Sequence, residues 1–246
     1  MTPILTYHSI AADVPRGFGP WVVHPQRFRE QLSHLAASHR MTMTVSEMVR
    51  RRRAGQPLEH AAVLTFDDGF ADFLHNALPV LRDFHMASTL YVTTGLVGGV
   101  FHGSKVLTWG ELAEIRDAGV EIGAHSVSHA ALDRLSAERV REEVGACKRE
   151  LEDRLGVGVN SFAYPFGYYT RAVRDAVVGA GYQSACAVGY AGSGHDDDRF
   201  ALRRFIVRPN SRRIDRAPTG AVFYRMRAAH WAWLRQSLRR WTSHDG

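Results

Sequence analysis

The chain has 246 residues, of which 45% are hydrophobic and 23% are charged. This composition is typical of a globular domain and excludes disordered, collagen-like and low-complexity proteins. No stretch reaches the roughly 18 apolar residues of a membrane-spanning helix. The formal net charge is +6, but residues 199–246 hold 12 arginines against two aspartates. The rest of the chain is slightly acidic, so we expect no nucleic-acid partner.

Several common functional signatures are missing. The sequence has no GxxxxGK phosphate loop and no GxGxxG at a strand-to-helix turn, which disfavours nucleotide chemistry. Its two cysteines, Cys147 and Cys186, are too few for a disulfide framework or a CxxC site. We interpret them as structural thiols in a reducing compartment. The first residues lead directly into a strand-like segment without a basic and apolar signal region, so the expected location is cytoplasmic.

Strand-like and helix-like segments alternate along the chain. Short apolar runs predict strands at 4–8, 62–66, 88–93, 120–124, 161–164, 184–188 and 201–207. Helical periodicity predicts helices at 24–38, 45–53, about 74–84, 108–119, 136–155 and 170–180. The fourth of these helices opens with a capping box, Thr108 to Glu111. Alternation at this spacing predicts an α/β fold with a parallel sheet or barrel.

Two adjacent carboxylates, Asp67 and Asp68, follow the strand predicted at 62–66. In α/β folds, reactive side chains gather at the carboxyl ends of parallel strands. Burying two carboxylates together is costly unless a cation or hydrogen bonds compensate. An ordinary Asp-Asp-Gly turn explains the pair equally well when it is considered alone.

Two histidines, His125 and His129, follow the strand predicted at 120–124. Histidines four positions apart share a face if the segment becomes helical after His125, and this spacing is found in metal sites. With 13 histidines in the chain, such a pair can also arise by chance. Two imidazoles and one aspartate, with open positions for water, predict a site for Zn²⁺ or a similar divalent ion.

A third element, Tyr164-Pro165-Phe166, ends the strand predicted at 161–164. Its simplest interpretation is a strand followed by a turn. As a functional element it would offer an aromatic wall for a sugar ring. The backbone N–H of Phe166 would then stabilise a developing oxyanion.

In this order, Thr65-Phe-Asp-Asp-Gly69, His125-x-x-x-His129 and Tyr164-Pro-Phe-Gly167 resemble the motifs of the polysaccharide deacetylases of the NodB-homology class, carbohydrate esterase family 4. The resemblance covers about residues 1–210. It implies a distorted (β/α) barrel that removes N-acetyl groups from amino sugars. The site residues implied are Asp67 as general base, Asp68, His125 and His129 as metal ligands, and Tyr164, Pro165 and Phe166 at the substrate. The metal implied is Zn²⁺, with Co²⁺ or Ni²⁺ as alternatives.

The sequence departs from that family's usual pattern at two places. The family has an arginine two residues before the proline of the third motif, where this chain has Ala163, and the late Leu-x-His that supplies the general acid is missing. The opening Leu5-Thr-Tyr-His8 is instead similar to a partly permuted branch that includes poly-N-acetylglucosamine deacetylases, where an early Tyr-His supplies the acid. The segment Ala201-Leu-Arg-Arg204 resembles that branch's late Ala-Leu-x-Arg. The resemblance therefore implies His8 as general acid and Arg204 beside Asp67.

We thus expect a divalent-metal-dependent hydrolase in which Asp67 takes a proton from the attacking water and His8 protonates the departing amine. Polymeric, oligomeric, lipid-linked and small glycoside substrates all fit these motifs. One alternative is an iron oxygenase with two histidines and one carboxylate, which the alternating β/α pattern disfavours. Another is an inactive glycan-binding or scaffold module of the same fold, which the complete set of acidic and histidine residues disfavours.

The last part of the chain is basic and helical in pattern. Residues 221–241 place Trp231, Leu234 and Trp241 roughly on one side, with arginines around the rest. We therefore divide the chain into a catalytic domain, 1–210, and a linker with a basic amphipathic helix, 211–246. The helix either packs on its own domain or makes peripheral contact with an anionic membrane surface.

Overall fold

Parallel strands pair side by side and close into a barrel. In order around the barrel they are β1 (Ile4–Tyr7), β12 (Leu202–Ile206), β11 (Ser184–Val188), β10 (Ser161–Ala163), β9 (Glu121–Ala124), β6 (Thr89–Val92) and β5 (Ala61–Phe66), which pairs with β1 again. A further strand, β4 (Met41–Met43), pairs with the first half of β5. This computed structural model describes residues 2–188, 198–211 and 214.

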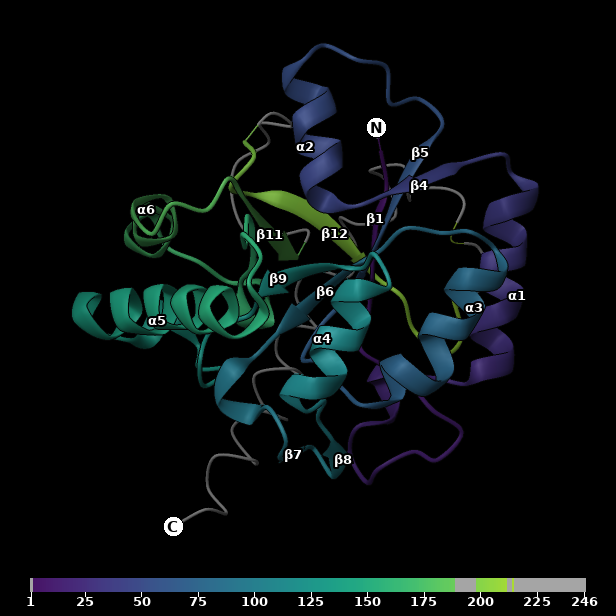
Figure 1. The fold of residues 1–246 in the computed structure, drawn as a ribbon, viewed down its shortest axis with the longest axis horizontal. Helices are drawn as coiled ribbons and strands as arrows, with labels where there is room; N and C mark the ends of the chain where they lie inside the picture. The colour runs from purple at the N-terminus through teal and green to yellow at the C-terminus, as the bar shows by residue number, and fades with distance from the viewer. Residues whose placement is uncertain (1, 189–197, 212–213, 215–246) are drawn as a thin grey trace, which may run out of the picture. The chain divides into compact units, whose positions relative to one another are not determined.

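Helices lie around the outside of the strands (Figure 1). They are α1 (Pro25–Ala37), α2 (Val45–Arg53), α3 (Leu78–Asp83), α4 (Trp109–Asp117), α5 (Ala137–Leu155) and α6 (Arg171–Gly179). The predicted capping box is confirmed, because Thr108 and Glu111 exchange side-chain and backbone hydrogen bonds. Alternating parallel strands and helices confirm the predicted α/β barrel.

One predicted helix is wrong in detail. The segment expected as a single helix at about 74–84 begins with a wide π-helical turn, η2 (Phe73–Ala77), and becomes α-helical only at Leu78. Pro79 lies in the first turn of α3 and has no N–H to donate to the preceding turn. The regular ladder of hydrogen bonds is therefore interrupted at this point.

Several short elements were not predicted, because two or three residues are too few to show a periodicity. They include β2 (Ser9–Ile10), β3 (Val22–Val23), β7 (Val100–Phe101) and β8 (Ser104–Lys105), and the one-turn helices η1 (Gly19–Trp21), η3 (Thr94–Leu96), η4 (Leu132–Arg134) and η5 (Pro165–Gly167). The hairpin of β7 and β8 lies at the opposite end of the barrel from the N-terminus (Figure 1).

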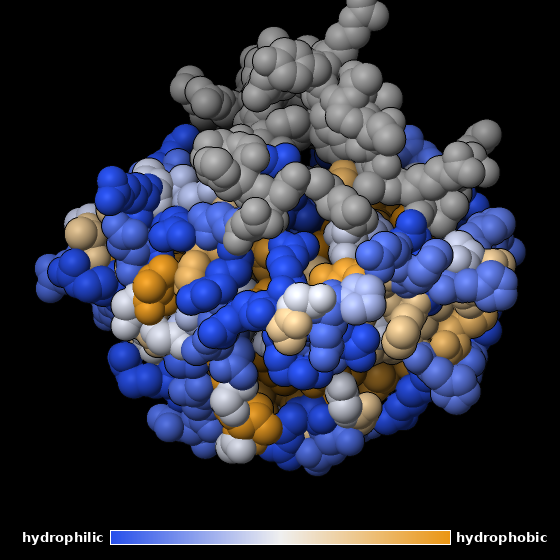
Figure 2. All heavy atoms as spheres, turned by 90° about the horizontal axis from the view of Figure 1, so that it is seen from above, coloured by the Kyte–Doolittle hydropathy of each residue, from blue (hydrophilic) through white to orange (hydrophobic). Residues whose placement is uncertain are grey.

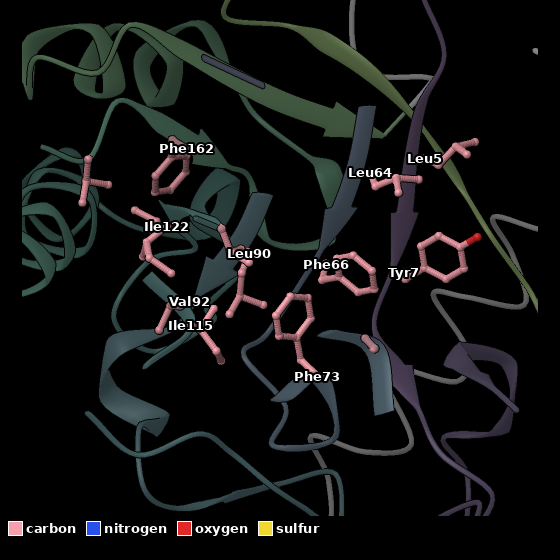
Figure 3. Close-up of a cluster of buried hydrophobic side chains, with 14 of the residues drawn as sticks. Leu5, Tyr7, Leu64, Phe66, Phe73, Leu90, Val92, Ile115, Ile122 and Phe162 are labelled. Atoms are coloured by element: carbon pink, nitrogen blue, oxygen red, sulfur yellow. The ribbon is translucent and has the colours of Figure 1, made fainter. Parts of the chain in front are cut away.

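The outward face of the barrel strands is apolar and packs against the helices. Figure 3 shows part of this layer, which includes Leu5, Tyr7, Leu64, Phe66, Leu90, Val92, Ile122 and Phe162 from the strands and Phe73 and Ile115 from the surrounding helices. The rings of Tyr7 and Phe66 stack at 5.3 Å, and Phe73 meets Phe66 edge-on at 4.8 Å. This layer is the main hydrophobic core.

The inward face is more polar and carries hydrogen bonds between side chains of adjacent and next-but-one strands. Thr6 bonds Thr65 at 3.1 Å, and the hydroxyl of Tyr91 bonds that of Ser161 at 2.6 Å. Gly123 makes room for the Tyr91 ring, since a Cβ there would lie 2.5 Å from ring carbons. Alternate side chains along each strand face the barrel interior. The same alternation continues just past the strand ends, where it directs further side chains into the barrel.

The described surface is mainly hydrophilic. Figure 2 shows blue side chains over most of the visible described area, with small separate apolar spots. Among the described residues, no helix combines the length and the hydropathy that crossing a bilayer requires. The predicted basic helix at 221–241 lies outside the described residues, as does most of the linker predicted to begin at 211.

Candidate active site

Asp67 and Arg204 form a buried ion pair inside the barrel. Asp67 follows β5 and Arg204 lies in β12, and both are less than 5% exposed. The guanidinium donates to Oδ1 at 2.6 Å and to Oδ2 at 2.8 Å. Burial is the largest single effect and favours the protonated acid, but the charge and hydrogen bonds of Arg204, together with the nearby His125 and His8, outweigh it and lower the pKa of Asp67 to about 2. Asp67 is therefore ionised at neutral pH.

Asp68 reaches the same site through an unusual backbone conformation. Adjacent residues of a strand point to opposite faces, but Asp68 has φ of 72°, in the left-handed region. This turn brings its carboxylate back toward the end of the barrel. Asp68 is 2% exposed, and its Oδ1 has no hydrogen-bond partner among the described residues. Burial and the neighbouring Asp67 raise the pKa of Asp68 well above its usual value.

His125 follows β9 and is also buried. Its Nδ1 lies 2.8 Å from the carbonyl oxygen of Ala163, so this nitrogen carries the proton and donates it. The other nitrogen, Nε2, then has a free lone pair and lies 3.5 Å from Oδ1 of Asp68. Burial lowers the pKa of His125, which keeps the imidazole neutral.

His129 completes the cluster, but not on a helix. Residues 125–129 form a loop in which Ser126 has φ of 67° and His129 has φ of 58°. The helical turn considered for this pair is therefore wrong, and the two rings converge because the loop curls back. Nε2 of His129 lies 3.3 Å from Oδ1 of Asp68. Burial lowers the pKa of His129 well below its usual value.

The residues present fit a divalent metal ion. Asp68, His125 and His129 offer one ligand atom each, and these atoms all lie within 4.8 Å of one another. The donor set consists of two imidazoles whose pKa values are lowered by burial and a buried carboxylate oxygen without a hydrogen-bond partner among the described residues. Such a nitrogen and oxygen set is typical of zinc and related ions.

His8 directly follows β1 and continues the alternation by which Ile4 and Thr6 face the barrel interior. Its Nδ1 is buried and has no hydrogen-bond partner among the described residues. Its ring lies 4.8 Å from that of Trp21, which sequence reasoning did not single out. Burial lowers the pKa of His8 to about 4, although Asp67 acts in the opposite direction. The imidazole is therefore neutral at pH 7.

The predicted aromatic wall is only partly correct. Tyr164 is fully buried, its hydroxyl donates to the carbonyl of Phe200, and Pro165 is buried beside it. Neither side chain is exposed for contact with a substrate, because Tyr164 packs in the core and Pro165 is buried. Phe166 is 37% exposed, has φ of 58°, and places its ring 4.7 Å from that of His129. Phe166 alone of the three faces the cluster.

The hairpin of β7 and β8 supplies a second aromatic side chain that sequence reasoning missed. Phe101 lies 5.2 Å from the His129 ring, on the hairpin side of the cluster. Only tertiary folding brings Phe101 and Trp21 to this place, and neither lies in a motif. Together with Phe166 they border the histidines with aromatic rings.

Comparisons with known proteins identify similar sequences. The family model for polysaccharide deacetylase matches residues 54–185. The Bacillus subtilis protein YxkH is 26% identical over 208 residues, which are 84% of this chain and 71% of YxkH. The poly-beta-1,6-N-acetyl-D-glucosamine N-deacetylase of Staphylococcus epidermidis is 22% identical over 195 residues, which cover 75% of this chain and 68% of that protein.

A solved structure shows the same barrel. The deacetylase PplD of Streptococcus pyogenes, in complex with acetate, aligns with a TM-score of 0.76 and 26% identity, over 85% of this chain and 93% of PplD. This likeness confirms the distorted (β/α) barrel that the motifs implied. The family model covers more than half of the sequence, including Asp67, Asp68, His125 and His129. The chain therefore belongs to the polysaccharide deacetylase family.

Proposed function

We propose that this protein is a divalent-metal-dependent hydrolase that removes N-acetyl groups from an amino-sugar glycan or glycoside. One observation carries the proposal. The unbonded oxygen of Asp68 and the Nε2 atoms of two neutral histidines converge beside an ionised aspartate held by an arginine. This arrangement combines a metal-ligand set with a separate carboxylate that can accept a proton.

Asp68, His125 and His129 would hold the metal, with Zn²⁺ as the first candidate and Co²⁺ or Ni²⁺ as alternatives. When bound, a divalent ion supplies Lewis acidity that activates water and polarises the acetamide carbonyl. The hydrogen bond from His125 to Ala163 fixes the tautomer that leaves Nε2 free for a metal.

Asp67 would act as the general base. Arg204 occupies one lone pair on each carboxylate oxygen, and a carboxylate has about four such positions. The remaining positions can accept a hydrogen bond and then the proton from an attacking water. The same ion pair keeps Asp67 deprotonated over the physiological pH range.

His8 would supply a proton to the departing amine, whose expulsion is difficult without one. The resting imidazole is neutral, so it must first take up this proton from solvent, while Asp67 holds the proton from the attacking water and returns it to solvent after the products leave. Negative charge developing on the acetamide oxygen raises the pKa of a nearby imidazole, because an opposite charge favours the protonated form. The backbone N–H of Phe166 is proposed to stabilise that oxygen.

The proposal is tested by hydrolysis of acetylated chito-oligosaccharides and of β-1,6-linked N-acetylglucosamine oligomers, with free amine and acetate both measured. The protein is stripped of metal with a chelator, checked by elemental analysis, and then titrated with Zn²⁺, Co²⁺ or Ni²⁺. We expect activity to vanish on stripping and to return with metal. Full activity of the metal-free protein would overturn the proposed metal dependence. Glycan binding without hydrolysis, at any metal concentration, would indicate an inactive binding module.

A further inference from the structure

Glu143 is a buried carboxylate on an otherwise apolar face of α5. It is 3% exposed, and the other buried residues of this helix are Val140, Val144, Cys147, Leu151 and Leu155. Its nearest cation, Arg139, lies 3.8 Å away on a side chain that is 57% exposed. Burying a carboxylate is unfavourable unless hydrogen bonds or a cation compensate. The position therefore needs an explanation other than packing.

The compensation comes from the loop that carries the two histidines. Oε2 of Glu143 accepts hydrogen bonds from the backbone N–H groups of Val127 and Ser128, both at 2.9 Å. Oε1 accepts from the Ser128 hydroxyl at 2.6 Å. The single carboxylate thus binds the middle of the 125–129 loop at three points, between His125 and His129.

The opposite side of the same loop is held by the first two residues of η3. The N–H of Thr94 donates to the carbonyl of Ser126 at 3.2 Å, and the N–H of Gly95 donates to that of Val127 at 2.8 Å. Gly95 cannot be replaced without a shift, since a Cβ there would lie 2.6 Å from the Val127 oxygen. The carbonyl groups of the loop therefore accept hydrogen bonds from the backbone of η3 on one side. The amides of the loop donate hydrogen bonds to Glu143 on the other side.

This double attachment stabilises an unfavourable backbone. Ser126 and His129 both have positive φ, a conformation that is unfavourable for residues other than glycine. Without an acceptor for the amides of Val127 and Ser128, the loop would relax and the Nε2 atoms of the two histidines would separate. His125 is anchored by Ala163, so His129 is the ligand that depends most on the loop.

We propose that Glu143 is a positioning residue that sets the metal affinity of the site by holding the 125–129 loop in its ligating shape. The inference rests on the proposed function, because it requires that His125 and His129 bind a metal. Glu143 is neither a proposed metal ligand nor a proposed substrate contact. It acts only through the backbone between the two histidines.

The experiment measures Zn²⁺ affinity of the chelator-stripped full chain by competition with a chromogenic chelator. The variants are Glu143→Ala, Glu143→Gln and the control Glu142→Ala. Glu142 is the exposed neighbour on the same helix and also pairs with Arg139. We expect Glu143→Ala to weaken Zn²⁺ binding about 10–100-fold, the range found when a group that orients metal ligands is removed. Glu142→Ala should bind as the wild type does.

The glutamine variant separates positioning from general destabilisation. Its amide oxygen can replace Oε2, and its NH₂ can donate to the Ser128 hydroxyl, so the three contacts survive without the charge. We expect its Zn²⁺ affinity to lie between those of the wild type and Glu143→Ala. Excess Zn²⁺ should also restore most deacetylase activity to Glu143→Ala, as it would not if the barrel were damaged. Thermal unfolding in the presence of chelator checks the fold of each variant.

Two results would overturn the inference while leaving the proposed function intact. One is wild-type Zn²⁺ affinity in Glu143→Ala. The other is an affinity of Glu143→Gln no better than that of Glu143→Ala when both are folded. If the wild type itself binds no divalent ion, the proposed function fails, and the role of Glu143 fails with it.

Discussion

Arg204 donates to both carboxylate oxygens of Asp67 inside the barrel, although 137 residues separate the two in sequence. The arginine reaches Asp67 from β12, across the interior, rather than from the third motif, where Ala163 stands. Two parallel N–H···O bonds fix the plane of the carboxylate as well as its charge. The orientation of the proposed base is thus set by a side chain far away in the sequence.

The first prediction concerns this ion pair. Arg204→Met should reduce stability by about 3–5 kcal/mol, because it leaves the buried Asp67 carboxylate without a cation. Arg204→Lys should recover part of the stability but little of the activity, since an ammonium cannot bond both oxygens in one plane. Urea unfolding and kcat are measured for both. Arg203→Met, on the same strand but exposed, is the control. Equal stability of the Arg203 and Arg204 variants would contradict the assigned role of the pair.

The second prediction separates the two adjacent aspartates. Asp67→Asn should retain bound metal but lose about 10²–10⁴-fold in kcat, the typical contribution of a general base. Asp68→Asn should lose the metal itself, because it replaces a carboxylate ligand by a neutral amide. Metal content by elemental analysis and kcat at fixed metal are compared. The same metal content and the same residual rate in both variants would show that the two carboxylates do not divide these roles.

The third prediction tests His8 by leaving group. His8→Ala should cost about 10²-fold or more on an N-acetyl substrate, since an amine needs a proton to depart. The loss should be much smaller on an activated acetyl ester, whose leaving group departs as an anion. kcat is measured for both substrates in wild type and variant at equal metal content. Equal losses on amide and ester would mean that His8 positions the substrate and does not act as an acid.

The fourth prediction concerns stability and pH in the metal-free protein. The pKa of His8 is about 4 in the folded state and about 6.5 when unfolded. Between these values the unfolded chain binds a proton that the folded chain excludes, so stability falls as the pH is lowered. The His8 contribution to that fall is about 1–2 kcal/mol between pH 7 and pH 5.

His8→Gln should reduce the steepness of this pH dependence. Urea unfolding at pH 7, 6 and 5 with chelator present measures the difference between wild type and variant. His34→Gln serves as a control, because that side chain lies on the exposed side of α1. Identical pH dependence in wild type and His8→Gln would show that burial does not perturb the His8 imidazole.

Much of the fold could be predicted from the sequence because local signals and tertiary structure agree. The apolar runs became the barrel strands, and Thr108 and Gly156 mark a helix start and a helix end where expected, Gly156 with φ of 65°. The π-helical turn before Pro79 could not be foreseen, since apolar periodicity does not distinguish it from an α-helix. The short hairpin that carries Phe101 gave no periodic signal.

The site was predictable as a set of residues but not as a geometry. Asp67, Asp68, His125 and His129 were recognised because carboxylates and imidazoles at strand ends are unusual. The left-handed conformation of Asp68, which lets neighbours in sequence face one centre, leaves no mark in residue type. Tyr164 was misassigned because an aromatic residue at a strand end can face either the core or the His125 and His129 cluster. The hydrogen bond to Phe200, which decides between them, is a tertiary contact.

The closure of the barrel depends on its last strand, β12, which is synthesised long after β1 and β5. β1 pairs with both β5 and β12, and the last of these is made some 140 residues after β5. Until β12 leaves the ribosome, β1 and β11 present open edges that can pair with other chains, and Asp67 has no countercharge. Contacts so distant in sequence slow folding, because a long loop must close before they form. We therefore expect the nascent chain to be prone to aggregation until β12 pairs with β1, and the same pairing brings Arg204 to Asp67.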